Sequence, residues 1–520
     1  MDLRNQDRMA ISRRDAIKGL ALSGCLAAGG DLQSLAAAVE KSQGGDKHNS
    51  YKYRIAFGAW INDMRNEPLP LQDWPAPQMD EETIRSAIAA MDVQAEAGFN
   101  YLDAWGLFAT KSYPPDIVSV FNDKIRRKRV NELIEAGKKR EIKLLFGLGL
   151  MSWGYDEIIK SDPEVRDPAS EHPHAMCGNK DKAWNYVKKI IDCALSEYDF
   201  CGVHLESADQ GWCQCPACGG RDGTVGYNVR LNIRAADYIK SKWPDKLVTV
   251  IPINWLNGTG RRWFNEDDKA RLIELSKHID CFMDLGWRGT YIADNERKDF
   301  MKKLHCAYGT AGGAHLYHSV RWDRSTYFLP YIRRSGNTIK QHYEEGARAC
   351  MLYQGPVSNP ATEINIAVGG RMLSDAKRNP EDVLAEAIEF YYKPKTQAAH
   401  KKLVDIFLRA EDTYCNGWDA KAFAAGRDPN SPWCGMPGEF YLNEKLYGKS
   451  PGPAGYLIEP YLNAAGRKAY REGLVSILKE LPVIKGSFDD TGRIAKIRRA
   501  VIVTLNLINT ICQCKGESWE

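Results

Sequence analysis

The strongest constraint on the fold of this chain is a regular alternation of apolar, strand-like runs with longer segments of helical periodicity. The strand-like runs lie at residues 53–61, 100–105, 142–150, 200–207, 247–253, 281–286, 306–317 and 349–354. Helical patterns follow the first seven runs at residues 81–97, 116–140, 180–195, 228–243, 267–278, 296–304 and 337–345. Eight such βα repeats predict an α/β protein whose parallel strands close into a (β/α)8 TIM barrel. A doubly wound open sheet is the alternative, but no Gly-rich phosphate-binding loop follows the first run.

The pattern changes after the eighth strand-like run. Helical segments are expected at residues 380–392, 396–413, 463–481 and 492–510. Pro380 suits a first helical position, because its missing N–H costs no hydrogen bond there. We therefore expect a barrel over residues 51–375 and a helical C-terminal module over residues 376–520.

The first 38 residues have the pattern of an export signal. Arg13 and Arg14 precede a stretch of small and apolar residues at positions 19–28, which is typical of a twin-arginine signal peptide. Residues 22–25 resemble a lipobox that would make Cys25 a lipidated N-terminus, whereas three alanines at positions 36–38 offer a conventional cleavage site. A polar, Gly-rich linker at residues 39–50 would follow. We expect an exported protein, either periplasmic or lipid-anchored at the cell envelope, whose one membrane contact would be an anchor at Cys25.

Charge gives no reason to expect a nucleic-acid partner. The formal net charge is +4 over 520 residues, and the short basic run at residues 124–129 has the helical context of a solvated helix face. Aromatic residues are plentiful, with 14 Trp and 24 Tyr. Such side chains fill cores and also stack on sugar rings, so their number alone decides nothing.

The fourth strand carries the clearest candidate for chemistry. Alternation places Val203 and Leu205 on one face, and His204 and Glu206 on the other. In a barrel the second face points inward, and active sites lie at the C-terminal ends of the strands. Asp209 follows in the next loop, so Glu206 and Asp209 form a candidate carboxylate pair of the kind that glycoside hydrolysis uses. The structural alternative is that Glu206 pairs with a nearby arginine or caps a loop.

Other strand ends carry groups that suit a carbohydrate-binding pocket. Asp103 competes with Asp209 as the partner of Glu206, as do Asp63 and Asp284 at the ends of the first and sixth strands. Together with His204, the expected substrate-binding residues are Asp63, Asp103, Trp105, Asp284, Trp287, Arg288, His315, His318, Tyr353 and Gln354.

A cluster of cysteines follows the fourth strand. Cys213, Cys215 and Cys218 need a fourth ligand to complete a tetrahedral Zn²⁺ shell, and Cys177 is our choice, with His174 as the fallback. Disulfide pairing is the alternative, since an oxidising periplasm permits it. Twin-arginine substrates fold in a reducing cytosol, which favours a structural zinc ion. No organic cofactor is expected. Two further pairs, Cys415 with Cys434 and Cys512 with Cys514, stay open.

Three stretches of the chain resemble a family of uncharacterised bacterial glycoside-hydrolase-like barrels related to the α-glucuronidases and the hexosaminidase-type barrels. They are residues 176–179 (Met-Cys-Gly-Asn), residues 206–218 with the CxCxxC loop, and residues 359–363 leading into 370–373 and 387–392. The resemblance implies that Glu363, in the segment after the eighth strand, faces the sugar. Two departures stand out. Such proteins usually carry an αβ domain before the barrel, whereas here the first expected strand begins almost directly after the expected linker, and residues 206–209 read Glu-Ser-Ala-Asp where many members have Asn-Asp-Gly.

These observations predict an exported glycoside hydrolase that acts on oligosaccharide or polysaccharide fragments, with Glu206 as general acid and Asp209 as assisting base or stabiliser. A non-catalytic surface glycan-binding protein is the first alternative. A metal-dependent hydrolase using His204, His315 and His318 is the second, although no HxH or HExxH spacing is present.

Overall fold

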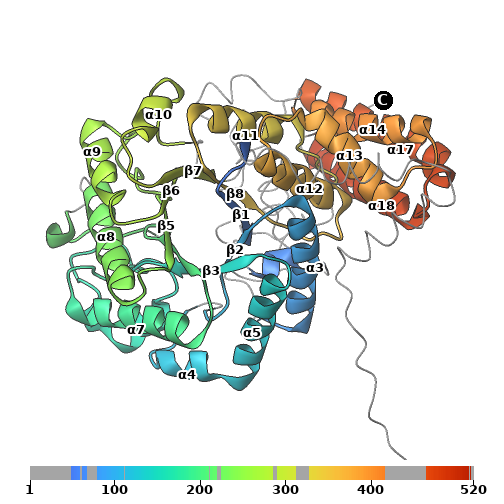
Figure 1. The fold of residues 1–520 in the computed structure, drawn as a ribbon. Coiled ribbons are helices and arrows are strands. Elements are labelled where there is room, and N and C mark those ends of the chain that lie inside the picture. Colours follow the sequence, from blue (N-terminus) through green and yellow to red (C-terminus); the bar gives the residue numbers. More distant parts are fainter. Residues whose placement is uncertain are drawn as a thin grey trace, which may run out of the picture. The chain divides into compact units, whose positions relative to one another are not determined.

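The strand-like runs form eight parallel strands that close into a barrel (Figure 1). They pair in chain order, and β8 pairs with β1 to complete the ring. The (β/α)8 fold predicted from the sequence is therefore confirmed. The strands are β1 (Tyr53–Gly58), β2 (Tyr101–Ala104), β3 (Lys143–Gly149), β4 (Gly202–Glu206), β5 (Leu247–Ile251), β6 (Cys281–Asp284), β7 (Ala307–Ala311) and β8 (Ala349–Tyr353).

The computed structural model describes residues 49–58, 61–66, 79–109, 112–209, 211–219, 224–284, 290–311, 327–415, 464–514 and 516. The described residues from position 51 onward form one compact unit. The predicted signal peptide with Cys25 and most of the predicted linker lie outside the described residues. Within the described ranges, no helix combines the length and apolar composition that crossing a bilayer would need.

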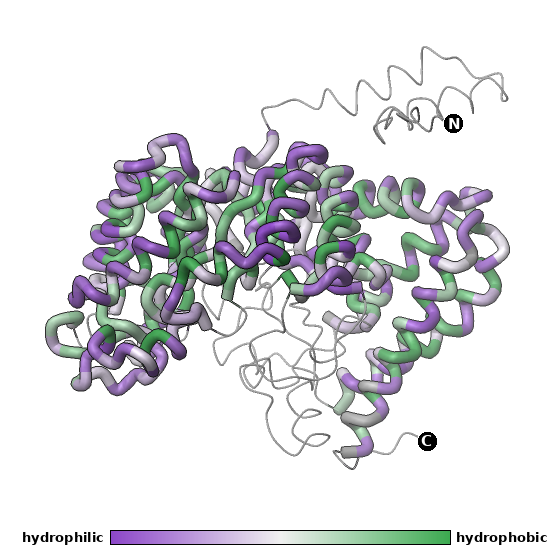
Figure 2. Tube along the Cα trace, turned by 90° about the horizontal axis from the view of Figure 1, so that it is seen from below, coloured by the Kyte–Doolittle hydropathy of each residue, from purple (hydrophilic) through white to green (hydrophobic). Residues whose placement is uncertain are grey.

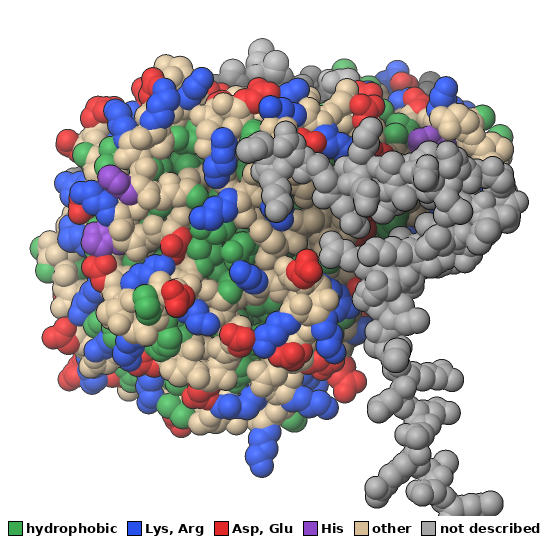
Figure 3. Space-filling view, viewed as in Figure 1, with side chains coloured by type: hydrophobic (Ala, Val, Ile, Leu, Met, Phe, Trp, Pro, Cys, Tyr) green, Lys and Arg blue, Asp and Glu red, His purple; other side chains and the backbone are tan. Residues whose placement is uncertain are grey.

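Helices surround the strands and bury one face against them. The helices of the barrel region are α3 (Glu81–Ala97), α4 (Ile117–Asn122), α5 (Lys124–Lys138), α6 (Asp156–Ser161), α7 (Asp181–Glu197), α8 (Thr224–Lys242), α9 (Glu266–Leu275), α10 (Asp294–Met301), α11 (Arg333–Glu345) and α12 (Pro360–Ser374). Hydrophobic and hydrophilic stretches alternate along them in Figure 2, as expected of helices with one buried face. On the face shown in Figure 3, Lys and Arg side chains are interspersed with Asp and Glu.

One predicted helix is wrong in a specific way. The segment expected to be a single helix at residues 116–140 forms two helices, α4 and α5. The break falls at Asp123, whose backbone leaves the helical region (φ −59°, ψ 121°) and whose side chain accepts a hydrogen bond from the Arg126 N–H at 2.7 Å. An aspartate that caps a new N-terminus in this way satisfies an N–H that would otherwise lack a partner.

The barrel interior and the layer between strands and helices have separate cores. Inward-facing residues of the strands, such as Ile55, Leu145, Met283 and Met351, form a cluster inside the barrel. The opposite faces of the same strands pack against the helices in a second, larger cluster. Side chains of the inner cluster therefore fill the barrel, and the cluster reaches the C-terminal strand ends through Phe57, Ile251 and Tyr353.

The C-terminal helices α13 (Pro380–Tyr392), α14 (Gln397–Cys415), α17 (Ala464–Ile484) and α18 (Thr491–Cys514) occupy the positions expected for a helical module. Polar contacts join them to the barrel region. The Glu411 carboxylate accepts hydrogen bonds from the backbone N–H groups of Arg333 and Arg334, and Thr504 accepts one from the Phe328 N–H at 2.7 Å. These contacts tie α14 to the first turn of α11, and α18 to the segment that precedes α11.

Candidate active site

The inner face of β4 presents His204 and Glu206 one above the other, as the alternation predicted. The register sets Gly147 of β3 beside His204, and Gly149 beside Glu206. On the other side, Thr249 and Ile251 of β5 lie beside the same two residues. Glu206 is the last residue of its strand, so its carboxyl group lies at the C-terminal end of the barrel, where this fold places active sites.

Buried polar side chains contact one another inside the barrel, next to Glu206. Nδ1 of His204 lies 2.6 Å from the hydroxyl oxygen of Thr249, and Nε2 lies 3.8 Å from Oδ2 of Asp103. The Trp105 indole N–H donates to the same Asp103 oxygen at 3.2 Å. Asp103 Oδ1, His204 Nε2 and Glu206 Oε1 are buried without a hydrogen-bond partner among the described residues. Buried polar atoms of this kind are costly in a folded protein, and three of them on the inner faces of β2 and β4 indicate a functional site.

Burial sets the protonation of this group. It raises the pKa of Asp103 and Glu206 well above the ordinary carboxyl range, and the nearby Asp209 and Asp103 carboxylates raise the pKa of Glu206 further. Burial also raises the pKa of Asp209 to about 6 and lowers the pKa of His204 to about 3. Near neutral pH, Asp209 is therefore largely ionised and His204 is neutral, and the raised pKa of Glu206 favours its protonated form.

Asp209 is half-buried in the loop after β4 and is positioned by the loop after β5. The Asn254 side chain donates to the Asp209 carbonyl oxygen at 2.9 Å. Asn254 adopts a left-handed backbone (φ 62°), which asparagine tolerates better than most residues. The two loops thus hold Asp209 beside the end of β4.

Aromatic rings line the wall around His204. Trp105 makes edge contacts with both Trp153 and His204, with ring centroids 5.7 and 6.2 Å apart, and Phe57 lies between His204 and Tyr353 at 6.1 and 4.6 Å. Two glycines on β3 provide space for these rings. A Cβ atom at Gly147 would overlap the Trp105 indole, and one at Gly149 would overlap Trp153. A polar centre bordered by aromatic rings is a suitable environment for a sugar, because rings stack on its C–H faces.

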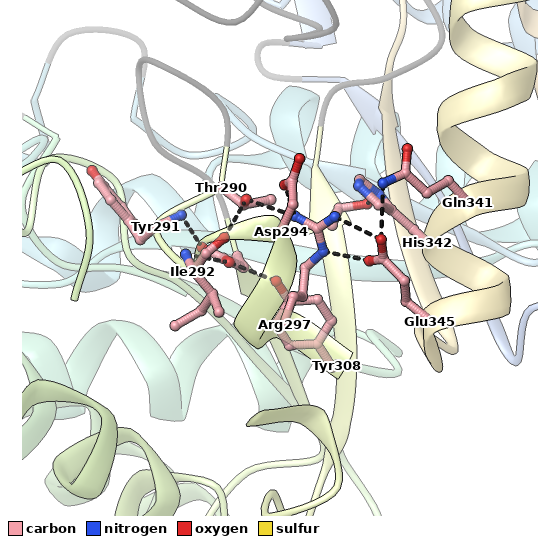
Figure 4. Close-up of polar contacts among 11 residues, drawn as sticks. Thr290, Tyr291, Ile292, Asp294, Arg297, Tyr308, Gln341, His342 and Glu345 are labelled. Atoms are coloured by element: carbon pink, nitrogen blue, oxygen red, sulfur yellow. Dashed lines mark hydrogen bonds and ion pairs between the residues drawn. The ribbon is translucent and has the colours of Figure 1, made fainter. Parts of the chain in front are cut away.

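Asp284 was expected in this pocket, but its side chain faces the helices. Cys281 and Met283 of β6 point into the barrel, which turns Asp284 outward. Its carboxylate accepts from the backbone N–H groups of Tyr291 and Ile292, and from the Tyr308 hydroxyl at 2.5 Å. These contacts belong to the network in Figure 4, and they anchor Tyr291 and Ile292 just before α10.

The same network buries an ion pair between α10 and α11. The Arg297 guanidinium donates twice to the Glu345 carboxylate, at 2.5 and 2.9 Å, and once each to Asp294 and Thr290 (Figure 4). A paired arginine–carboxylate contact is geometrically specific, and breaking it would leave a buried charge. We assign this network, Asp284 included, to the stability of the barrel.

Gln354 and Glu363 also lie outside the cluster around Glu206. The Gln354 side chain receives a hydrogen bond from Gln94 of α3 at 3.1 Å and donates to the backbone of its own strand. Glu363, in the first turn of α12, forms an ion pair with Arg493 of α18. Their described contacts are structural, so we leave both out of the proposed site.

Five of the expected substrate-binding residues have no described side chain. Asp63 belongs to a short 3-10 helix (Ile61–Met64), but its side chain lies outside the described part. Outside the described residues altogether are Trp287, Arg288, His315 and His318. Of the expected set, the structure brings together Asp103, Trp105, His204, Glu206, Asp209 and Tyr353.

The four expected cysteine ligands do gather. The sulfur atoms of Cys177, Cys213, Cys215 and Cys218 lie within 4.8 Å of one another, all four residues are buried, and none forms a disulfide. The Cys177 sulfur lies 3.9 Å from Cys215 and 3.6 Å from Cys218. Four sulfurs at about 2.3 Å from a tetrahedral Zn²⁺ ion would be about 3.8 Å apart, so the donor set fits this metal. The expected fallback, His174, instead lies 2.5 Å from Asp156 on the surface.

Local structure prepares this cluster for a cation. The Cys218 N–H donates to the Cys215 carbonyl at 3.0 Å in a tight turn, and Gly219 follows in a left-handed conformation (φ 102°). The Asn179 side chain donates to the Cys218 sulfur at 3.1 Å. Hydrogen bonds from the neighbouring thiols lower the pKa of Cys177, which favours a thiolate in this cluster. The remaining open pairs involve Cys434 and the side chains of Cys415 and Cys514, which lie outside the described part.

Sequence reasoning missed Trp153 and Thr249. Trp153 lies in the connection after β3, which carries no periodic signal, although the glycines at positions 147 and 149 indicate space for a large side chain. Thr249 faces His204 across the strand pair, a relation that depends on register. Thr249 could have been found from the sequence as a polar residue at an inward-facing position of the strand next to β4.

Solved structures of glycoside hydrolases share this fold. A GH138 enzyme targeting pectin rhamnogalacturonan II matches with a TM-score of 0.53 and 11% identity, over 89% of this chain and 58% of the enzyme. A family GH115 4-O-methyl-α-glucuronidase with specificity for decorated arabinogalactans gives a TM-score of 0.52 and 11% identity, over 90% and 56%. This chain therefore spans less than two thirds of either enzyme's length.

No protein-family model matches the sequence, and no curated protein matches it. The class that the fold defines is the (β/α)8 barrel, an architecture that this chain shares with these two glycoside hydrolases. At 11% identity the likeness establishes the fold, and activity has to be argued from the site.

Proposed function

We propose that this protein is an exported glycoside hydrolase that cleaves oligosaccharide or polysaccharide fragments, with Glu206 as the general acid. The observation that carries the proposal is the state of Glu206. It ends β4 inside the barrel mouth with Oε1 unpartnered among the described residues, and burial raises its pKa well above the ordinary range. A carboxylic acid that stays protonated near neutral pH can protonate the glycosidic oxygen as the bond to the sugar breaks.

Asp209 supplies the complementary carboxylate. With its pKa raised to about 6, it is largely ionised at pH 7 and can take a proton from the attacking water or stabilise the cationic sugar. In the first case, water adds to the anomeric carbon, its proton goes to Asp209, and the proton of Glu206 leaves with the departing alcohol. The configuration of the first-formed product, read by NMR, distinguishes this role from a covalent one.

The wall below the carboxylates is suited to hold a sugar. Asp103 and His204 offer unpartnered polar atoms, and Trp105, Trp153 and Tyr353 offer ring surfaces. The two solved enzymes with this fold are described as acting on a pectin rhamnogalacturonan and on decorated arabinogalactans, which supports a plant-type polysaccharide as the first class to test.

The cysteine cluster is proposed as a structural zinc site. Four thiolates complete a tetrahedral shell and leave no position for water or substrate, so a bound ion would stabilise the loop after β4 without entering the chemistry. Export is proposed from the paired arginines at positions 13 and 14 and the apolar stretch that follows. Replacing both arginines by lysine should keep the protein in the cytoplasm, as cell fractionation would show.

The first experiment compares the purified protein with its Glu206→Gln variant on a broad glycan panel, by new reducing ends and mass spectrometry. Cleavage by the wild type and not by the variant supports the proposal. Full activity in Glu206→Gln would refute the assigned acid. Binding without cleavage by either protein would identify a glycan-binding protein instead, with Glu206 a ligand contact. Glu132→Gln, a change at an exposed position of α5, is the matched control and should be fully active.

A further inference from the structure

A cavity of about 370 Å³ lies among the loops that follow β3, β4 and β5. Its lining residues are Glu171, His172, Trp212, Gln214 and Gly258. This volume is within the range of small-molecule sites, and these loops belong to the C-terminal ends of the strands, the end that carries Glu206. Trp212 follows Asp209 by three positions in the same loop. None of these residues has a role in the chemistry proposed above.

The cavity walls are held in place from several directions. Gly211 has a left-handed backbone (φ 92°), and a Cβ atom there would overlap the His172 ring. The Gln214 N–H donates to the Ser170 hydroxyl at 3.1 Å. Arg166 donates to the carbonyl oxygens of both His172 and Ser170. A site built by such contacts is formed before a ligand arrives, which reduces the ordering cost of binding.

The lining contains polar atoms whose hydrogen bonds are not made within the described structure. Nε1 of Trp212, a side chain only 6% exposed, and Nδ1 of His172 are both buried without a partner among the described residues. Burial, with His174 and Arg166 nearby, lowers the pKa of His172, so its ring is neutral at pH 7. Together with the Gln214 amide, these groups are neutral hydrogen-bonding partners of the kind that recognise hydroxyl groups.

The charge of the lining decides between classes of sugar. None of the described residues that line the cavity is basic, and Arg166, which lies near His172, donates its side-chain hydrogens to the backbone carbonyls of His172 and Ser170. A uronate or sulfated sugar would need an arginine, a lysine or a helix N-terminus to offset its charge. An uncharged ring meets no such cost, and the Trp212 indole adds an apolar surface.

We propose that this cavity is a subsite for an uncharged sugar unit of the substrate, next to the unit cleaved at Glu206. The proposal rests on the proposed glycosidase function and names the class of sugar that its binding site takes. It also explains the place of the cysteine cluster, because Cys213 and Cys215 flank Gln214 and fix the loop that forms one wall.

Calorimetric titration of the full chain carrying Glu206→Gln tests this without turnover. The probes are cellohexaose, maltohexaose, xylohexaose and mannohexaose, with hexagalacturonate as the acidic counterpart. We expect at least one neutral probe to bind, hexagalacturonate to bind at least about tenfold more weakly, and Gln214→Ala to weaken the neutral probe by about tenfold through its lost hydrogen bonds. Gln397→Ala, an exposed glutamine at the start of α14, is the matched control and should leave binding unchanged.

The outcomes separate this proposal from the one it rests on. Neutral binding that depends on Gln214, in a protein whose wild type cleaves no glycan, would keep the subsite and refute the hydrolase. Cleavage by the wild type with an unchanged dissociation constant and KM in Gln214→Ala would keep the hydrolase and refute the subsite. Equal binding of hexagalacturonate, or no binding of any neutral probe at millimolar concentration, would also overturn the subsite.

Discussion

Nε2 of His204 lies 3.8 Å from Oδ2 of Asp103 inside the barrel, and both side chains are fully buried. The two groups nevertheless do not form an ion pair. Burial lowers the pKa of His204 to about 3, so the imidazole is neutral at pH 7, and it raises the pKa of Asp103 well above its ordinary range. His204 therefore offers Glu206 no cation that would stabilise its carboxylate, which favours the protonated form of Glu206.

The rate of glycan cleavage should therefore depend on pH through two groups. Activity is expected to rise as pH increases through about 6, where Asp209 ionises, and to fall at higher pH as Glu206 loses its raised-pKa proton. The two carboxyl groups interact, so the measured values belong to the pair. In Asp209→Asn the acidic limb should disappear and the alkaline limb remain. A kcat/KM that is constant between pH 5 and 8 would contradict this assignment.

Glu206→Gln should stabilise the fold more at pH 8 than at pH 5. A carboxyl group whose folded-state pKa is raised binds its proton more tightly when folded, so it costs stability as pH rises above its unfolded value, near 4.5. The amide has no such penalty. The gain should be about 1.4 kcal/mol for each unit of raised pKa, up to the pH of measurement. Urea unfolding at both pH values checks it, and an equal effect at each would contradict the raised pKa.

Gly147→Ala should disturb the aromatic wall. The added methyl group overlaps the Trp105 indole, so the ring must move away from Asp103 and His204. We expect a loss of about 1–3 kcal/mol in unfolding free energy and weaker glycan binding. Gly486→Ala is the matched control, because no atom lies within 4 Å of a Cβ added there. Similar unfolding curves for the two variants would show that β3 does not depend on a glycine at position 147.

Cys177→Ser should remove most of the metal bound by the purified protein. Only three thiolates would remain, and the expected results are a metal content well below one per chain and a lower Tm. His174→Ala should keep both values, because His174 contacts Asp156 and lies outside the cluster. Elemental analysis and thermal unfolding measure the two effects. A Cys177→Ser protein with full metal content would exclude Cys177 as a ligand.

The fold was predictable because buried parallel strands leave a strong signal. Each strand of the barrel contains an apolar run bounded by polar segments, and helices with one buried face separate the runs. The break at Asp123 was missed because the helical pattern continues across it, and only the side-chain cap reveals two helices. Helix α12 was not among the helices predicted from periodicity, which begin at residue 380 after the eighth strand, although Asn359 and Pro360 form a typical helix start.

The site was predictable only where alternation was unambiguous. On β4, Val203 and Leu205 contrast with His204 and Glu206, so the inward face could be assigned. On β6, Cys281, Phe282 and Met283 are all apolar, and nothing in the sequence indicates that Asp284 faces the helices. Gln354 has the same difficulty at the end of β8. The cavity beside Trp212 is lined by three loops, and no sequence pattern within one loop predicts that the three lie together.

The positions of the four cysteines have a consequence for how the chain reaches this fold. Cys177 precedes α7 and the other three follow β4, so the segment between them contains the strand that bears Glu206. A metal ion joining the two ends would close a loop of about 40 residues in the unfolded chain, which removes conformational entropy worth on the order of 4 kcal/mol. The supply of metal during biosynthesis would then decide how readily the segment from α7 through β4 folds, before the protein binds any substrate.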